Sequence, residues 1–434
     1  MTKTISGWGN YPQQESQCIT PSTAALLCAA VKLEENLIAR GMGRSYGDSA
    51  NASRVLQTMY IDHFIEFDNT TGKFTAEAGI TLLDILKLVV PKGWFLPVTP
   101  GTSYVTLGGA IASDVHGKNH HIAGTFGQHV TSLNLVLGTG EIITASKNEN
   151  ADLFHATCGG MGLTGIIISA TIQLLPIQSS FINKKTIKAE CIEATYEALD
   201  SNSNTSYSVA WIDCLSKGKS LGRSVLSLGE HAEQGKLEIN FKQTVSVPFA
   251  TPSVLLNNLT MKAFNTFCWH KSKHNQNQTT SLMHFFYPLD ALGKWNKLYG
   301  KQGFIQFQCV VPKESGVANM RKLLTEISNS GESSFLAVLK QFGQANDNLL
   351  SFPIEGYTLA LDFKLSASVI KTVSRLEAMV VDMGGRLNLT KDAIMQEKTF
   401  KRTYLNWEKF EDIREKYGAI GKFSSSQSKR IGLS

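Results

Sequence analysis

Glycine-rich segments in the first half of the chain have the composition of a backbone site for an anionic ligand. In residues 39–49 (ARGMGRSYGDS), Gly41, Gly43 and Gly47 lie close together, beside two arginines, a serine and a tyrosine. Glycine allows close approach and lets several backbone N–H groups point at one anion, so the segment predicts a phosphate cradle. A tight loop between strands is the alternative, because glycine spacing alone is a weak signal. The segment lacks the spacing of the Walker and Rossmann motifs.

Two further segments repeat this composition. Residues 97–121 (PVTPGTSYVTLGGAIASDVHGKNHH) contain Gly108, Gly109 and a run of small residues at 110–113, which suits close approach to a flat ring or a pyrophosphate. Residues 158–172 (CGGMGLTGIIISATI) carry four glycines before a β-rich run. Together the three segments indicate one long ligand with a diphosphate, held by backbone. A catalytic triad is not supported, because no GxSxG or comparable nucleophile is present.

The sequence HGKNHH brings His116, His120 and His121 together. A metal site needs three or four ligands of suitable type and geometry. Here the acidic neighbour is Asp114, and Lys118 would oppose a cation. We therefore predict no metal site, and favour a histidine that hydrogen-bonds a ligand or buried backbone.

The elements that must position these segments are of mixed type. In the first half, strand patterns occur at residues 72–79 and 162–177, a hairpin at 132–146, and a helical pattern at 80–93. Strands arranged partly as hairpins argue against a regular βαβ repeat.

The second half has a different character, with fewer glycine clusters after residue 179. Strand-like runs at 282–289, 303–312 and 356–363 alternate with helical patterns at 314–331 and 367–385. This order suggests a separate α+β domain. The final residues are charged and helical in places.

The composition is that of a globular chain of two or three domains. Hydrophobic residues make up 42% and charged residues 18% of 434 residues, which excludes a disordered chain. The formal charge of +6 is mild, so it does not mark a nucleic-acid binder. Seven cysteines without a CxxC pair predict neither a disulfide framework nor a zinc site. We also predict no signal peptide and no membrane-spanning segment.

In this order, the three glycine segments resemble the FAD-binding domain of the vanillyl-alcohol oxidase / p-cresol methylhydroxylase superfamily. Within it, the chain is most similar to the decaprenylphosphoryl-β-D-ribose 2′-oxidase family. The likeness covers almost the whole chain, and its most specific elements are HGKNHH and TKD. Its other blocks are GWGNYP (7–12), FFYPLDALGKWNKLYG (285–300), GFIQFQCVVP (303–312), LKQFG (339–343), SFPIEGY (351–357) and GGRLNLTKD (384–392).

The resemblance implies an α+β fold with bound FAD. Residues 1–178 would form a PCMH-type FAD-binding domain of two subdomains. Residues 179–385 would form a substrate or cap domain of antiparallel sheet and helices, and residues 386–434 would return to the FAD domain. The implied flavin contacts are Ala39, Arg40, Gly41, Met42, Gly43, Arg44, Ser45, Tyr46, Gly47, Asp48, Ser49, Gly101, Thr106, Leu107, Gly108, Gly109, Ser113, Asp114, Val115, His116, Ile167 and Asn388.

Some positions depart from the pattern of the family or superfamily. Asn388 stands where the family has a tyrosine near the flavin, so that contact is altered. Several superfamily members attach FAD covalently through a histidine in the first glycine loop. Arg44 and Ser45 occupy that region here, which favours non-covalent FAD. Ala360 replaces the family's inhibitor-reactive cysteine, so that thiol is not needed here or the substrate differs.

The implied chemistry is oxidation of a secondary alcohol on ribose, with hydride transfer to flavin N5 and loss of a proton to a base. Lys391 aligns with the active-site lysine and would stabilise the developing negative charge. His116 would lie at the ring or orient the sugar. Gln306 and Gln308 alternate onto one strand face and would bind the sugar, and Lys340 would bind the substrate phosphate.

The implied partners are a lipid-linked sugar and a short-chain reductase that consumes the 2-keto product for arabinose-donor synthesis. Residues 232–280 are polar and basic, which predicts a surface loop or a partly disordered excursion. Within them, residues 267–274 would meet the membrane surface with Trp269 as an anchor, or would be a solvent-exposed loop. We expect a cytoplasmic protein that binds peripherally at the inner membrane face.

Other functions remain open at this stage. One is a soluble sugar, alditol or aldonolactone oxidase on the same scaffold. Another is a flavin-binding or assembly protein without turnover, such as a scaffold for the reductase. The retention of His116, Lys391 and both glutamines argues against the second of these.

Overall fold

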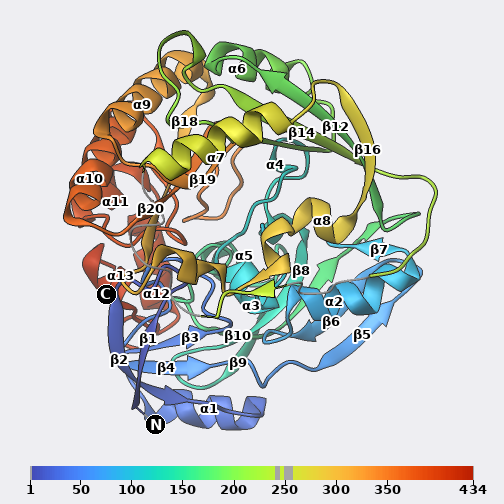
Figure 1. Ribbon diagram of the computed structural model, residues 1–434. Coiled ribbons are helices and arrows are strands. Elements are labelled where there is room, and N and C mark those ends of the chain that lie inside the picture. Colours follow the sequence, from blue (N-terminus) through green and yellow to red (C-terminus); the bar gives the residue numbers. More distant parts are fainter. Residues whose placement is uncertain (1, 240–244, 249–257, 434) are drawn as a thin grey trace.

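The computed structural model describes residues 2–239, 245–248 and 258–433 of the chain. Its first part contains a four-stranded sheet and a five-stranded sheet, besides a pair of two-residue strands at Trp94–Phe95 and Leu175–Pro176 (Figure 1). In the first sheet, the order β1-β2-β4-β3 combines one antiparallel pair with two parallel pairs. The second sheet, β5-β6-β10-β8-β9, is antiparallel throughout. Their strands are β1 (Thr2–Ser6), β2 (Gln13–Ile19), β3 (Leu37–Arg40), β4 (Arg54–Gln57), β5 (Phe64–Asp68), β6 (Lys73–Glu77), β8 (Val130–Val136), β9 (Ile142–Ala145) and β10 (Ile166–Gln173).

Short helices connect these strands. In α2 (Leu82–Val89), the Thr81 side chain accepts a hydrogen bond from the Asp84 N–H group and caps the N-terminus. Five of its eight residues are buried at helical spacing, and Gly93, at φ 83°, ends the following turn. The helix predicted at 80–93 is confirmed. The remaining elements of this half are α1 (Ala24–Leu33), α3 (Leu107–Ala112), α4 (His120–Ala123), α5 (Ala151–Thr157), β7 (Trp94–Phe95) and β11 (Leu175–Pro176).

An eight-stranded antiparallel sheet dominates the second half of the chain. Helices α6 (Ile192–Asp200), α9 (Gly316–Ser330) and α10 (Ala367–Asp382) cover one of its faces, and their apolar side chains share a core with it (Figure 1). The other face is turned toward the glycine-rich segments. In spatial order the strands are β16 (Gln276–Ser281), β12 (Phe181–Ala189), β14 (Ser224–His231), β13 (Tyr207–Ile212), β19 (Ser334–Phe342), β20 (Gly356–Lys364), β18 (Phe304–Pro312) and β21 (Arg386–Leu387).

The last helices pack against the first sheet. Phe423 forms an isolated bridge with Leu37, and the fully buried Arg414 donates hydrogen bonds to three backbone carbonyls, including that of Leu163. The α+β fold is therefore as expected, and the exact division into domains stays a prediction. These helices are α11 (Glu397–Thr403), α12 (Trp407–Lys416) and α13 (Ser426–Arg430).

The strand predicted at residues 282–289 is wrong. Residues Leu282–Phe286 form helix α8, which Ser281 caps, and a 3-10 turn follows. Both Phe285 and Phe286 are buried among aromatic side chains. A short, continuously apolar run does not show a period, so the sequence could not distinguish a buried helix from a buried strand.

The surface loop predicted within residues 232–280 is also corrected. Helix α7 (Asn258–Lys271) and β16 occupy its second part, while β15 (Val245–Ser246) pairs with β17 (Leu292–Gly293). Trp269 is only 5% exposed, and the ammonium of Lys188 lies 4.1 Å from the centroid of its ring. It therefore does not serve as an exposed anchor. Residues 240–244 and 249–257 of this stretch lie outside the described residues.

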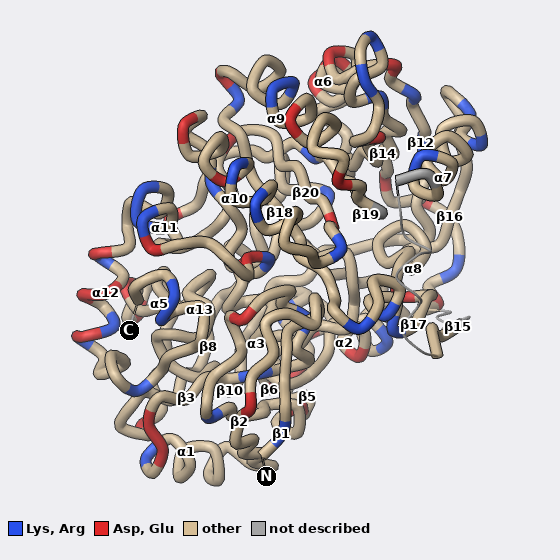
Figure 2. Tube along the Cα trace, turned by 60° about the vertical axis from the view of Figure 1, so that its left-hand side comes forward, with Lys and Arg blue, Asp and Glu red and all other residues tan. Residues whose placement is uncertain are grey.

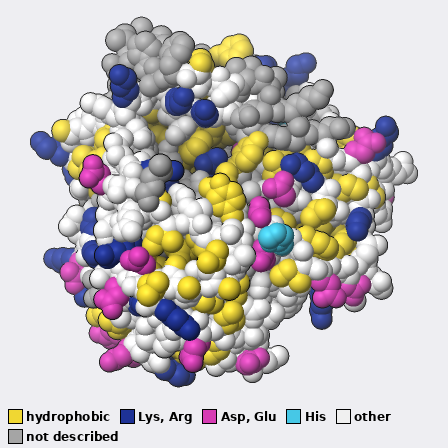
Figure 3. All heavy atoms as spheres, turned by 90° about the horizontal axis from the view of Figure 1, so that it is seen from below, with side chains coloured by type: hydrophobic (Ala, Val, Ile, Leu, Met, Phe, Trp, Pro, Cys, Tyr) yellow, Lys and Arg dark blue, Asp and Glu magenta, His cyan; other side chains and the backbone are white. Residues whose placement is uncertain are grey.

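Charged side chains are mixed on the surface. Figure 2 shows basic and acidic residues side by side on α11 and α12, and the face in Figure 3 carries scattered hydrophobic, basic and acidic groups. None of the seven cysteines is in a disulfide. Within the described ranges, no helix is both long enough and apolar enough to cross a bilayer.

Candidate active site

The N-terminal segment closes one side of the first glycine loop, residues 41–49. The Ser45 carbonyl accepts a hydrogen bond from the Trp8 N–H group at 2.7 Å. A Cβ atom at Gly7 would lie 2.2 Å from a loop carbonyl oxygen, so only glycine permits this approach. The GWGNYP segment thus supports the loop from behind.

The opposite side of the loop presents backbone N–H groups. Within the described residues, nothing accepts a hydrogen bond from the N–H groups of Met42, Gly43, Arg44 and Ser45. Gly43 has a φ of 61°, and turns that pass through this left-handed region form anion-binding concavities of successive N–H groups. The loop therefore fits the diphosphate of FAD.

The second glycine segment packs against the first. Thr106 caps α3, and its Oγ1 atom accepts a hydrogen bond from the Gly109 N–H group at 3.1 Å. A Cβ atom at Gly41 would lie 2.3 Å from the same Oγ1 atom. Glycine at residue 41 therefore brings the two segments into contact, and Gly109 is left exposed.

Asp114 organises the turn that leads to the histidines. It is buried, with a φ of 39°. Its carboxylate accepts hydrogen bonds at 2.7–2.9 Å from the Gly127 N–H group and the side chains of Asn346, Asn348 and Ser351. This network joins the HGKNHH segment to the second half of the chain and holds His116 in place.

His116 and Gln308 meet beside the large sheet. The Gln308 Nε2 atom donates to His116 Nε2 at 3.1 Å and to Thr358 Oγ1 at 3.2 Å, and its Oε1 atom accepts from Asn388 Nδ2 at 3.0 Å. Because His116 Nε2 accepts this hydrogen bond, that nitrogen carries no proton and the ring is neutral. Burial, with the cation of Lys340 nearby, lowers the pKa of His116 well below its usual value.

Lys391 lies against the first glycine loop. Its ammonium is 3.7 Å from the centroid of the Tyr46 ring, and the Tyr46 N–H group donates to the Thr390 carbonyl at 2.9 Å. Burial lowers the pKa of Lys391, while the Asp362 carboxylate opposes that shift. Asp362 is itself fully buried and accepts a hydrogen bond from Gln306, and burial raises its pKa. The site therefore holds a half-buried lysine within electrostatic reach of a fully buried acid.

Strand register places the predicted residues of the second half on one face of the sheet. Gln306 lies opposite Asp362 and Gln308 opposite Ala360, and β19 continues the pairing. Cross-strand partners point to the same side of a sheet. That face, toward which His116 and Lys391 reach, therefore carries Gln306, Gln308, Lys340, Ala360 and Asp362.

Lys340 is half-buried on this face. No residue that the structure describes forms a hydrogen bond or ion pair with its ammonium. Burial lowers its pKa to about 8. An unpaired ammonium in such a place suits an anionic ligand.

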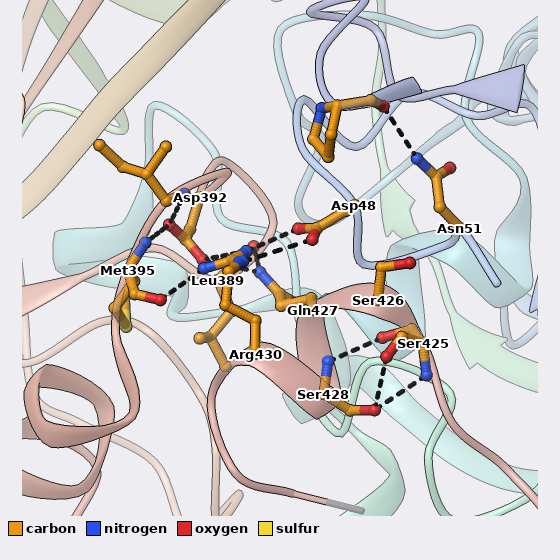
Figure 4. A network of polar contacts seen from close by, with 12 residues as sticks. Asp48, Asn51, Leu389, Asp392, Met395, Ser425, Ser426, Gln427, Ser428 and Arg430 are labelled. Carbon is orange, nitrogen blue, oxygen red and sulfur yellow. Dashed lines mark hydrogen bonds and ion pairs between the residues drawn. The ribbon is translucent and has the colours of Figure 1, made fainter. Parts of the chain in front are cut away.

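A network around Arg430 connects the first glycine loop with the TKD turn (Figure 4). The Arg430 guanidinium contacts the carboxylates of Asp48 at 2.6 Å and Asp392 at 3.0 Å. Asp392 also accepts a hydrogen bond from the Met395 N–H group, and Gln427 donates to it. Because Asp392 follows Lys391 directly, Arg430 fixes the position of Lys391 relative to the loop.

Other predicted contact residues have structural partners. Arg40 donates to the Ala50 carbonyl and to the Asn51 side chain, and Arg44 lies 4.3 Å from the Trp8 ring centroid. Ile167 on β10 is buried in the second core, whereas Gly101 is exposed with open space around it. The structure thus brings His116, Lys391 and the glutamines together.

The histidines of HGKNHH point to different partners. His120 Nδ1 accepts from the Gly343 N–H group at 3.2 Å, and His121 Nε2 donates to the Thr205 carbonyl at 2.9 Å. In the part of the chain that the structure describes, no three His, Cys, Asp or Glu side chains are placed to hold a metal ion.

Sequence reasoning missed Asp362, Arg430 and the role of Trp8. A lone acid in the apolar strand GYTLALDF, opposite Gln306, was a usable signal for Asp362. Arg430 lies in a charged C-terminal segment, and no local sequence pattern distinguishes its role from that of the adjacent Lys429.

Comparison with known proteins supports this description. A family model described as "FAD binding domain" matches residues 19–146. Decaprenylphosphoryl-beta-D-ribose oxidase of Mycolicibacterium smegmatis is 35% identical over 451 residues, covering 100% of this chain and 98% of that protein. L-Gulonolactone oxidase of Mus musculus is 23% identical, covering 86% of this chain and 83% of that protein. Human Delta(24)-sterol reductase is 28% identical over 31% of this chain and 27% of its own length.

Proposed function

Because this chain belongs to the decaprenylphosphoryl-β-D-ribose oxidase family of FAD-dependent oxidoreductases, we propose that it oxidises the 2′-hydroxyl of a polyprenyl-phosphoryl-β-D-ribose to the 2′-ketone. The observation that carries the proposal is that His116, which is hydrogen-bonded to Gln308 of the large sheet, lies within electrostatic reach of Lys391, which itself lies against the loop with the unpaired backbone cradle. FAD, when bound, supplies the acceptor for the hydride that leaves the sugar carbon. No histidine lies in residues 39–49, which supports non-covalent FAD.

Lys391 would stabilise charge. Its ammonium would interact with the negative charge that develops on the sugar oxygen as the hydroxyl gives its proton to a base. Before the reaction, the Asp362 carboxylate offsets the positive charge of Lys391, and the face of the Tyr46 ring holds the ammonium.

His116 and the glutamines would orient the sugar. Both N–H groups of Gln308 are used by His116 and Thr358, so its main role would be to fix the neutral imidazole. The Gln308 Oε1 atom keeps one lone pair for a sugar hydroxyl. Lys340 would hold the phosphate of the substrate.

The function is tested by the flavin spectrum of the purified protein, recorded without oxygen. Polyprenyl-phosphoryl ribose should bleach the flavin, while free ribose, alditols and L-gulonolactone should not. Bleaching by soluble sugars or lactones alone would replace the proposal by the soluble sugar oxidase, which the likeness to L-gulonolactone oxidase makes the second candidate.

The 2′-ketone would be consumed by a partner short-chain reductase that forms the arabinose donor. We propose that the two act on the cytoplasmic side of the membrane, where a lipid-linked substrate is presented. Co-purification of a reductase with this protein, and faster turnover in its presence, would support that pairing.

We propose that the exposed phenylalanines of helix α7, and not its buried Trp269, contact the membrane. Phe267 is 60% exposed and Phe264 is 37% exposed, and the Lys271 ammonium lies 5.6 Å from the Phe267 ring centroid. Residues 239–289 contain no Asp or Glu, so no acid in this stretch repels anionic lipid. Exposed aromatic and basic groups on one helix suit the interface of an anionic bilayer.

Replacing Phe267 by serine should therefore weaken binding to phosphatidylglycerol vesicles about tenfold, the magnitude expected for one phenylalanine withdrawn from lipid. Vesicle co-sedimentation measures this, with Leu405→Ser, another exposed apolar residue, as the control. Equal binding of the two variants would remove α7 from the membrane contact.

Ala360 predicts resistance to nitroaromatic inhibitors that label a cysteine. The wild-type protein should form no stable adduct, because Ala360 faces the site opposite Gln308 and carries no thiol. Ala360→Cys should gain one. Intact-mass spectrometry after turnover with the inhibitor measures both. An adduct on the wild-type active site would contradict the prediction.

A further inference from the structure

We propose that Lys118 and Lys184 join Lys340 in one anion site that takes the phosphodiester of the substrate, an inference that rests on the proposed function. Lys118 comes from the HGKNHH segment, and Lys184 and Lys340 come from strands β12 and β19 of the large sheet. The site would explain how the enzyme discriminates between a sugar that is linked to lipid through phosphate and a free sugar.

Lys118 is fixed over the sheet by backbone and aromatic contacts. Its carbonyl accepts a hydrogen bond from the Ser208 N–H group at 2.8 Å. Its ammonium donates to the Phe286 carbonyl at 3.1 Å and lies 5.3 Å from the Phe285 ring centroid. One of its three N–H donors is therefore used, and two remain for a ligand.

Lys184 lies on the same side of the sheet as Gln306 and Gln308. It is opposite Gly229 on β14, which in turn is opposite Tyr207 on β13. Following this register across β19 and β20 leads to Lys340 and to Gln308 on the same face. The Phe285 ring, over which the Lys118 ammonium lies, also occupies the space that a Cβ atom at Gly229 would need. Because Lys184 is opposite Gly229, Lys184 and Lys118 approach the same aromatic side chain.

None of these lysines has an acidic partner within the described parts of the chain. Other half-buried cations do: Arg223 pairs with Asp213 at 2.8 Å, and Arg430 pairs with two carboxylates. Burial lowers the pKa of Lys118 to about 7, and Lys340 and Lys184 add to this shift. Lys118 is therefore within electrostatic reach of both.

The Lys118 ammonium is repelled by those of Lys184 and Lys340, and each of the three loses hydration. A phosphodiester removes both costs, because its oxygens accept charge-assisted hydrogen bonds from several ammonium groups at once. A neutral sugar hydroxyl does not offset the charge. The arrangement thus favours a phosphate-linked substrate, with the sugar directed toward Gln308 and Lys391.

The test compares neighbours on opposite faces of β12. Lys184→Gln should raise the KM for polyprenyl-phosphoryl ribose about tenfold or more, the loss expected for one hydrogen bond to a charged group, with kcat and FAD content unchanged. Lys185→Gln, which changes an exposed side chain on the other face of β12, should leave the KM unchanged, and Lys184→Arg should restore it. The Ki of farnesyl phosphate, which has no ribose, should rise in Lys184→Gln in parallel.

Equal KM and Ki values for Lys184→Gln and Lys185→Gln would overturn the inference and leave the proposed function standing. If the wild-type protein does not oxidise the lipid-linked sugar, but farnesyl phosphate still binds in a Lys184-dependent manner, the site stands and the substrate assignment fails. Inorganic phosphate as a competitor separates recognition of phosphate alone from recognition of lipid phosphate. Lys184-dependent competition by inorganic phosphate or by farnesyl phosphate supports the anion site.

Discussion

Lys391→Met should slow flavin reduction by the lipid-linked sugar about 100- to 1000-fold, the range found when one preorganised group that stabilises developing charge is removed. Methionine keeps much of the side-chain volume beside Tyr46 but carries no charge. FAD should remain bound, because the backbone cradle at residues 42–45 does not involve Lys391. Anaerobic stopped-flow absorbance measures the rate.

Lys398→Met is the matched control, since Lys398 is an exposed lysine seven positions further along the chain. It should reduce its flavin at the wild-type rate. A Lys391→Met variant that also does so would remove Lys391 from the chemistry, whereas loss of FAD in this variant would assign the lysine to cofactor binding instead.

The pH dependence gives a second check on the role of Lys391. Burial lowers the pKa of Lys391 below that of an exposed lysine, so the ammonium is lost at a lower pH. If the ammonium stabilises the developing charge, the rate of flavin reduction should fall as pH rises through this lowered pKa. In Lys391→Met this limb of the profile should be absent. A limb that persists in the variant would belong to another group.

Arg430→Met should lower the free energy of unfolding by about 3–5 kcal/mol, the cost typical of breaking a buried ion pair by removing one partner. Its guanidinium is the shared partner of Asp48 and Asp392, both nearly fully buried, so the variant leaves two buried carboxylates without their cation (Figure 4). Urea unfolding followed by circular dichroism measures the change.

The variant should also affect the site, because Asp48 belongs to the first glycine loop and Asp392 follows Lys391. We expect weaker FAD retention together with slower flavin reduction. Lys429→Met, on the adjacent exposed lysine, should change neither stability nor rate by a measurable amount. Equal stability of Arg430→Met and Lys429→Met would show that the network does not hold the loop and the TKD turn together.

Much of the site could be predicted because its signals are local. Glycine segments predict where backbone approaches an anion, and alternation in GFIQFQC places Gln306 and Gln308 on one face whatever the partner strands are. The helix at 80–93 and the hairpin at 132–146 followed from periodicity in the same way. The match at Lys391 came from resemblance, and the contact with Tyr46 gives it a physical setting.

By itself, the sequence predicted the α+β fold class and, through its resemblance to a known family, the FAD cofactor and the oxidoreductase family, because the blocks that carry this resemblance are read from residue order alone. Tertiary structure alone decided which groups balance the buried charges: Asp362 beside Lys391, and Arg430 between Asp48 and Asp392. It also decided that Trp269 is buried while Phe267 is exposed. The physical reason is that pairing and burial depend on surfaces contributed by segments distant in sequence, and a local pattern shows which residues share a face but not what covers that face.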